Sequence, residues 1–173
     1  APCPGPVARC GAGGPGLDEW TAAQFAASDA LIYIGAVGIA VRAIAPHCRS
    51  KAADPAVVVL DECGRFAVPL LSGHLGGANA LARRLAAVCG AVPVITTATD
   101  LHGLFAVDEW AKRQSCVVAE PERIKRVSGA LLAGKCVHFT ADWPIQGTLP
   151  AGVQPAADGC ADFALTLTPT GQA

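Results

Sequence analysis

Continuous runs of apolar residues in the first hundred positions predict the strands of a sheet. Residues 30–34 and 56–60 are apolar throughout, which is typical of strands covered on both faces. Turn-forming residues follow at 61–64, and the apolar run returns at 66–71 as a third strand. A shorter run at 92–95 predicts a fourth strand.

Residues with helical spacing lie between these strands. A helix is predicted over 18–28, and a second over 39–45, where Pro46 stops it. A third, amphipathic helix precedes the fourth strand and ends at Gly90, a typical C-terminal stop. Because strands alternate with helices, the pattern predicts an α/β fold with a mostly parallel sheet.

The same alternation restarts beyond Asp100. The predicted elements are helices over 107–114 and 122–132, strands over 116–119, 135–140 and 163–167, and a loop over 142–162. We therefore expect two small three-layer α/β units with mostly parallel sheets. Their predicted bounds are 18–104 and 105–173, preceded by a loop or frayed end over 1–17.

Composition and charge exclude several classes of protein. The chain has 173 residues, 52% hydrophobic and 16% charged, which excludes a disordered protein. A net charge of -1 offers no general attraction to nucleic acid or to anionic lipid, so neither is expected as a partner. The longest uncharged apolar stretch, 30–41, is shorter than the roughly 20 residues needed to cross a bilayer.

The ends and the cysteines add two expectations. The chain lacks methionine and begins at Ala1, so we expect a processed chain or, in preference, a piece of a longer one. Its eight cysteines show no CxxC pair or other zinc spacing. Several lie in apolar segments, which favours reduced cysteines and a cytoplasmic protein.

Three loops follow apolar strands, where ligands gather in open α/β sheets: 35–38, 72–79 and 96–100. In the first, Gly35 and Gly38 let the backbone approach a ligand, and Arg42 can grip a carboxylate. A tight turn with a surface arginine explains the same residues equally well.

The second loop, SGHLGGAN, combines Ser72, His74 and Asn79 with three glycines at a helix start. It can hold an oxyanion and supply a base near neutral pH. An elaborate helix cap with His74 bonded to backbone is the alternative. The third loop, TTATD, offers hydroxyls to a carboxylate or merely caps a strand end.

Several ordered strings resemble the CbiG family of cobalamin biosynthesis. They run from about Asp29 to Asp100 and read LIYIGAVGIAVRAIAP, DPAVVVLDECGRF, LLSGHLGGANALARRLA and PVITTATD. Residues 105–170, which include FAVDEWAKR and ERIKRVSGALLAGK, resemble the central domain of that family. The resemblance implies a hydrolase that opens the δ-lactone of cobalt-precorrin-5A and releases acetaldehyde to give cobalt-precorrin-5B.

The resemblance also bears on the completeness of the chain and on its partners. Family members usually begin with a further strand and helix, and many carry a C-terminal domain. We therefore expect the amino-terminal and central part of a larger enzyme. The implied partner is a polycarboxylated cobalt-tetrapyrrole substrate, together with other cobalamin-pathway enzymes or that C-terminal domain. No cofactor and no protein-bound metal are expected, because the substrate carries the cobalt.

We assign expected roles to the three loops by their chemistry. His74 is the predicted general base, and the amides of Gly76 and Gly77 are the predicted oxyanion donors. The predicted substrate contacts are Gly35, Gly38, Arg42, Ser72, Gly73, Asn79, Thr96, Thr97, Thr99 and Asp100. Two other functions stay open: a non-catalytic tetrapyrrole-binding module of a larger biosynthetic enzyme, and a nucleotide- or phosphate-binding domain.

Overall fold

A computed structural model describes residues 5–11, 13–50, 53–157 and 159–167. Part of the predicted loop over 1–17 therefore lies outside the described residues, namely 1–4 and 12. The chain divides into two compact units, Ala1–Ile95 and Thr96–Ala173, which are described separately. None of the described helices is both long and apolar enough to cross a membrane.

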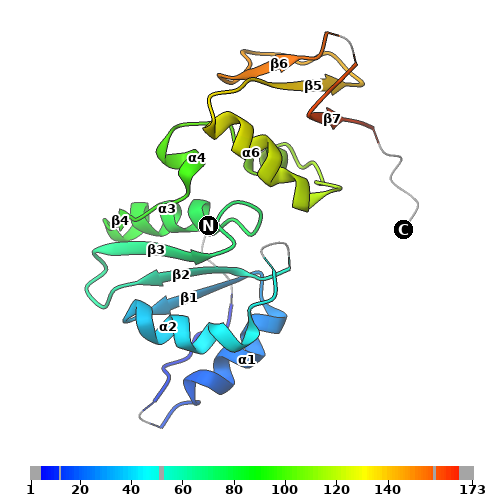
Figure 1. Cartoon of the computed structure of the whole chain (residues 1–173). Coiled ribbons are helices and arrows are strands. Elements are labelled where there is room, and N and C mark those ends of the chain that lie inside the picture. Colours follow the sequence, from blue (N-terminus) through cyan, green and yellow to red (C-terminus); the bar gives the residue numbers. More distant parts are fainter. Residues whose placement is uncertain (1–4, 12, 51–52, 158, 168–173) are drawn as a thin grey trace. The chain divides into compact units, whose positions relative to one another are not determined.

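The first unit is built on a four-stranded sheet, sheet A, with the strands in chain order (Figure 1). The strands are β1 (Ala30–Ile34), β2 (Ala56–Leu60), β3 (Phe66–Leu71) and β4 (Val92–Pro93). β1 pairs with β2 in parallel and β3 with β4 in parallel, whereas β2 and β3 are antiparallel. Sheet A is thus mixed but mostly parallel, as the sequence predicts.

Helices cover both faces of sheet A and complete three layers (Figure 1). The helices are α1 (Leu17–Ala27), α2 (Val37–Ile44) and α3 (Ala78–Cys89), with a short 3-10 turn, η1 (Ala45–His47), after α2. Leu31, Val57 and Val59 pack on one face against α1 and α2. Alternate residues, among them Ala56 and Val58, pack on the other face against the alanines of α3. All five residues of β2 are buried, which explains its unbroken apolar run.

The antiparallel step between β2 and β3 decides which loops can lie together. Ile34 pairs with Leu60 at the end of sheet A where β1 and β2 both finish. Leu71, the last residue of β3, pairs with Val57 near the start of β2. The loop after β3 therefore emerges at the opposite end of the sheet from the loop after β1. We call these the Ser72 end and the Gly35 end.

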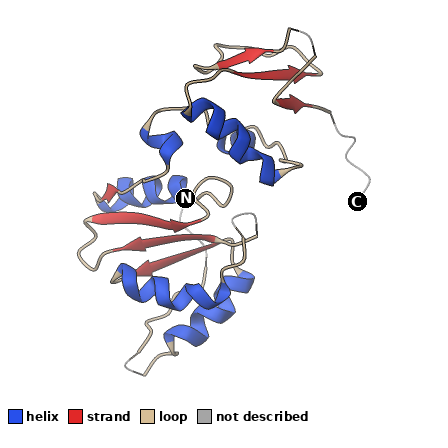
Figure 2. Cartoon of the chain, viewed as in Figure 1, coloured by secondary structure: helices blue, strands red, loops and turns tan. Residues whose placement is uncertain are grey.

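The second unit packs its helices against a three-stranded, all-parallel sheet (Figure 2). Its elements are α4 (Ala98–Leu101), α5 (Val107–Arg113), η2 (Pro121–Arg123), α6 (Ile124–Leu132), β5 (Val137–Ala141), β6 (Val153–Pro155) and β7 (Phe163–Leu165). Val127 and Leu131 of α6 pack on Val137 and Phe139 of β5. The α/β class is confirmed. The first unit has the predicted three layers. In the second unit, the described core lies on one face of the sheet, so a third layer is not seen among the described residues.

Three features of the second unit differ from the sequence predictions. The predicted strand over 116–119 does not form, because the Cys116 amide donates to the Ala111 carbonyl at 2.8 Å and closes α5. The predicted loop over 142–162 contains β6, an edge strand that tolerates its Pro155. The hydroxyl-rich turn at 96–100 contains the start of α4. The contacts group residues from Thr96 onward with this unit, because α4 packs against α6.

Candidate functional site

The loop between β3 and α3, residues 72–77, begins with a buried residue in an unusual conformation. Ser72 has a φ of +56°, in the left-handed region that side chains disfavour, and only 7% of it is exposed. Its hydroxyl donates to the backbone carbonyl of Asp54 at 2.9 Å. Ser72 thus ties the loop to the segment that precedes β2.

The loop folds back onto the first turn of α3. The Ala78 amide donates to the Ser72 carbonyl at 3.1 Å, and the Asn79 amide donates to the Gly73 carbonyl at 3.0 Å. Two amides at the helix start are therefore used by the loop itself. The loop therefore caps α3, as one interpretation of SGHLGGAN predicts, and its oxyanion-binding and base roles stay a prediction.

The glycines of this loop are required for two different reasons. A Cβ on Gly76 would lie 2.3 Å from the Ser72 Cβ and 2.8 Å from the Ser72 carbonyl oxygen, so only glycine fits. Gly77 caps α3 with a φ of +87°, which favours glycine. A Cβ on Gly73 would lie 3.0 Å from the Asn79 Oδ1, and Asn79 itself is buried. Tight packing, rather than flexibility, accounts for Gly76.

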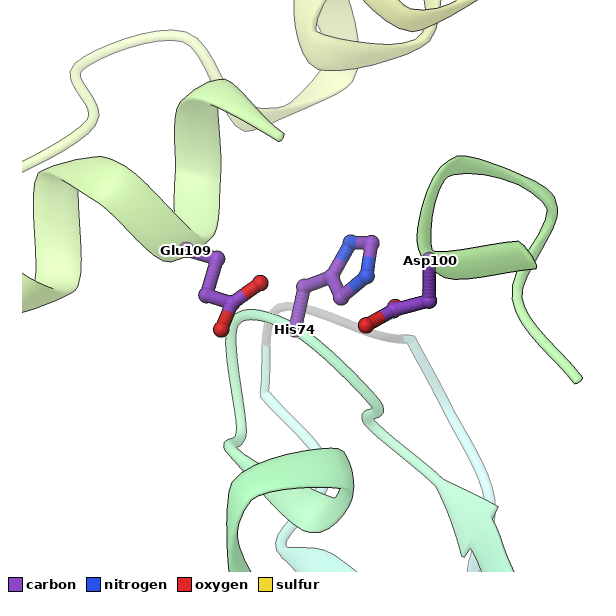
Figure 3. Close-up of side chains that lie close together, drawn as sticks. All are labelled: His74, Asp100 and Glu109. Atoms are coloured by element: carbon purple, nitrogen blue, oxygen red, sulfur yellow. The ribbon is translucent and has the colours of Figure 1, made fainter. Parts of the chain in front are cut away.

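His74 lies within this tightly packed loop. Its imidazole projects away from the loop backbone (Figure 3), and the residue is half-buried. A histidine titrates close to neutral pH and is the commonest general acid or base in enzymes. The arrangement therefore offers a proton-transfer group on a loop with a defined backbone.

Gly35, Gly38 and Arg42 lie at the other end of sheet A. Gly35 has a φ of +149°, which only glycine adopts readily, and its amide donates to the Leu60 carbonyl at 2.8 Å. The Arg42 Nη1 donates to the Gly38 carbonyl at 3.3 Å on the exposed side of α2. The first unit alone therefore does not bring these three residues to the 72–77 loop. The three loops were expected at one edge because ligands gather at the carboxyl ends of parallel strands, whereas β2 and β3 form an antiparallel hairpin.

The four residues predicted in the third loop surround α4. Thr97 is the N-cap of this helix, and its hydroxyl donates to the Asp100 carboxylate. Thr99 is buried, with 5% of it exposed, whereas Thr96 is exposed. The Thr97 hydroxyl thus contributes to the local structure of α4, Thr99 is buried in that helix, and Thr96 is the accessible threonine.

Within the second unit, Asp100 of α4 and Glu109 of α5 each carry a carboxyl group (Figure 3), and oxygen atoms of the two lie within 4.8 Å of each other. Sequence reasoning missed Glu109, because an acidic residue in the first turn of a helix is expected on electrostatic grounds alone. The pair offers two oxygen ligands. Divalent cations take about six or more, so the pair alone does not define a metal site.

Cys48, close in sequence to Asp54, is a poor candidate for a nucleophile. Desolvation, followed by the charge of Asp54, raises the pKa of the Cys48 thiol above its ordinary value. Its Sγ donates to the Ile44 carbonyl at 3.3 Å. A thiol with a raised pKa stays protonated at neutral pH and is weakly nucleophilic.

Comparisons with known proteins match both units. The family model described as the N-terminal region of cobalamin synthesis G matches residues 19–100. The model described as the cobalamin biosynthesis central region matches residues 105–159. The two models follow one another along the chain and together include every predicted site residue.

Two curated relatives carry the same name. A cobalt-precorrin-5A hydrolase of Salmonella typhimurium is 59% identical over 87 residues, covering 50% of this chain and 25% of that protein. A cobalt-precorrin-5A hydrolase of Priestia megaterium is 44% identical over 130 residues, covering 72% of this chain and 35% of that protein. The chain thus matches about a quarter to a third of the length of these relatives.

One solved structure is also similar. It is a cobalamin biosynthesis protein G homologue from Sulfolobus solfataricus, with a TM-score of 0.48 and 24% sequence identity. The similarity covers 85% of this chain and 46% of that one.

Proposed function

This chain belongs to the CbiG family of cobalamin biosynthesis, and we propose that it is the part of a cobalt-precorrin-5A hydrolase that carries the reacting groups. Both family models support the proposal, as does the shared name of the two relatives. The observation that carries it is the 72–77 loop, which lies inside the first matched region and holds His74 on a tightly packed backbone.

The proposed reaction has two steps that balance with one water molecule. Water attacks the δ-lactone carbonyl, the acyl C–O bond breaks, and a carboxylate and a hydroxyl form. That hydroxyl then loses its proton, its electrons form the C=O bond of acetaldehyde, and the carbon–carbon bond to the macrocycle breaks. The macrocycle accepts that electron pair and a proton. The class is therefore a hydrolysis that ends in carbon–carbon cleavage.

Both steps call for a base and for stabilisation of a developing negative charge. We assign the base to His74, which would accept a proton from water in the first step or from the hydroxyl in the second. Amides of Gly76 and Gly77, next to it in the loop, are the proposed oxyanion donors. Both glycines lie within three residues of His74 in the sequence, so their amides belong to the same loop as the proposed base.

The proposed ligand is the polycarboxylated cobalt-tetrapyrrole. The protein is nearly neutral overall, so local hydrogen-bond donors must bind the carboxylates of this ligand, and we assign that role to the loop around His74. In this proposal the cobalt belongs to the substrate, and the chain needs no cofactor of its own. We also propose a cytoplasmic setting, because the seven described cysteines are free, which is usual in reducing compartments.

Acetaldehyde release from cobalt-precorrin-5A by this chain is the decisive measurement. We expect wild type to release acetaldehyde and His74→Ala to lower kcat by about 10²- to 10⁴-fold, the usual contribution of a general base. His138→Ala is the matched control. It removes another imidazole, on β5, whose side chain is 42% exposed and whose Nδ1 lies 3.6 Å from the Asp162 carboxylate, so full activity is expected.

Two results would contradict the proposal. Full activity in His74→Ala would remove His74 from the chemistry. If wild type instead binds the macrocycle tightly without releasing acetaldehyde, the result would favour the non-catalytic tetrapyrrole-binding module. Visible absorption of the macrocycle measures that binding separately from acetaldehyde release.

A further inference from the structure

We propose that Ser72 is a positioning residue, which holds the 72–77 loop in its working shape through the backbone of Asp54 and does not bind substrate. The catalytic part of this inference rests on the function proposed above for His74. The structural part stands on contacts within the first unit alone.

The conformation of Ser72 is one that surrounding contacts must hold in place. Among the described residues, the non-glycine residues with a positive φ are Ser72 and Ser115. A left-handed serine is strained, and such strain persists only where neighbouring interactions over-determine the backbone. At Ser72 the neighbouring interactions are its hydroxyl bond to Asp54 and its burial.

The acceptor of that bond is itself fixed. Asp54 is 8% exposed, and both of its carboxylate oxygens accept from the Arg49 amide at 3.0 Å. Two residues further on, the Ala56 amide donates to the Asp29 carbonyl at 3.0 Å, where β2 begins beside β1. The Asp54 carbonyl is thus part of the frame of sheet A, and Ser72 ties the loop to that frame.

Ser72 also determines where the proposed oxyanion donors lie. The backbone of Gly76 packs so closely on Ser72 that an added Cβ would meet the Ser72 side chain at 2.3 Å. The Ser72 carbonyl accepts the Ala78 amide as well. A shift of Ser72 would therefore move both ends of the segment that carries His74.

This geometry changes the role expected for Ser72 from the sequence. Its hydroxyl has one proton to donate, and that proton goes to the Asp54 carbonyl. A serine whose donor is already used, and which is nearly inaccessible, is poorly suited to bind a substrate carboxylate. Positioning is the role that the contacts support.

Two substitutions of Ser72 test the proposal in the whole chain. Ser72→Ala removes the hydroxyl but keeps the Cβ and the left-handed strain. Ser72→Gly removes the hydroxyl and also the strain, so loss of stability is not its main effect. The matched controls are Ser115→Ala and Ser115→Gly, because Ser115 has a φ of +57° at the end of α5 in the second unit.

The first measurement is backbone hydrogen exchange, which needs no substrate. We expect exchange at the Ala78 and Asn79 amides to accelerate about fivefold or more in both Ser72 variants, the change expected from losing one ordinary hydrogen bond. Neither Ser115 variant should change it. Unchanged exchange in the Ser72 variants would overturn the proposal, whatever the activity of wild type.

The second measurement is the kinetics of acetaldehyde release. We expect kcat to fall about tenfold to hundredfold in both Ser72 variants while KM stays within about threefold, because misplacing a reacting group lowers the rate more than it weakens binding. A raised KM with unchanged kcat would instead make Ser72 a substrate ligand and overturn the proposal. If wild type itself releases no acetaldehyde, the proposed function fails, and hydrogen exchange alone then decides whether Ser72 positions the loop.

Discussion

The two ends of sheet A look alike in sequence and differ in construction. Each has a glycine loop that joins an apolar strand to a helix. At the Gly35 end, a Cβ added to Gly38 would meet only the tip of the Arg42 side chain, at 3.5 Å, and Gly35 has open space around it. At the Ser72 end, Gly76 packs on Ser72, which bonds to Asp54.

Glycine content alone therefore does not identify a ligand-binding loop. Gly35 is needed for its φ of +149°, which makes a turn, whereas Gly76 is needed for close packing. A loop held by packing and side-chain anchoring keeps its reacting group in place, which catalysis requires. We therefore propose the chemistry for the Ser72 end and expect the Gly35 end to serve as a structural turn.

Gly76→Ala tests this contrast most severely. Because its Cβ would lie 2.3 Å from the Ser72 Cβ and 2.8 Å from the Ser72 carbonyl oxygen, the backbone must shift. Overpacking of this kind lowers the free energy of unfolding by about 1–3 kcal/mol. Urea denaturation should show that loss, and acetaldehyde release should fall with it.

Gly129→Ala is the control for this substitution, since a Cβ on Gly129 of α6 would meet nothing within 4 Å. It should leave the midpoint of urea denaturation unchanged or raise it. Wild-type stability in Gly76→Ala would show that the 72–77 loop is as adaptable as the Gly35 end, and the contrast would be lost.

The strands of the first unit could be predicted from the sequence because apolar runs and turn residues specify them locally. The structure places β1, β2 and β3 at the predicted positions. The directions in which individual strands pair, which decide where each loop lies, were not predicted. A turn at 61–64 makes β2 and β3 antiparallel, so the loops after β1 and β3 leave sheet A at opposite ends.

In the second unit, short apolar runs did not predict the strands correctly, because a strand forms only where a neighbouring strand can pair with it. The apolar residues at 116–119 lie in the connection after α5, and Val117 is 94% exposed. Val153–Pro155 forms a strand despite its proline, because β5 offers it a free edge. Neither outcome is encoded within the segment itself.

The part of the candidate site that lies in one continuous sequence segment, 72–79, could be predicted. His74 and its glycines are neighbours in sequence, so their association needed no fold. The anchor at Asp54 lies 18 residues before Ser72, and the bond uses a backbone carbonyl, which no residue type reveals. Glu109, near Asp100 within the second unit, was missed because an acidic residue in the first turn of a helix is expected on electrostatic grounds alone.

Gly38→Ala sharpens the contrast from the other end of sheet A. Gly38 lies in α2 with space for a Cβ, so alanine removes the entropic cost of a helical glycine. We expect the free energy of unfolding to rise by about 0.5 kcal/mol, measured by urea denaturation. Kinetics of acetaldehyde release should stay at wild-type values. A loss of activity would mean that the substrate approaches this backbone closely, as the sequence alone suggested.

Arg42→Ala should have the smallest effect on the kinetics of acetaldehyde release. It tests whether the Gly35 end of sheet A binds substrate at all. The Arg42 guanidinium donates to the Gly38 carbonyl, at the end of sheet A away from the 72–77 loop. A strand of five residues separates the two ends by about 15 Å. We expect both kcat and KM to stay within about threefold of wild type.

Arg84→Ala is the matched control for Arg42→Ala, because it removes an exposed arginine from α3 in the same unit. If Arg42→Ala raises KM about tenfold and Arg84→Ala does not, a substrate carboxylate binds at the Gly35 end. The macrocycle would then contact both ends of the sheet, and the 72–77 loop would supply the chemistry but only part of the binding. Equal, small changes in KM in the two variants would place no substrate carboxylate at the Gly35 end.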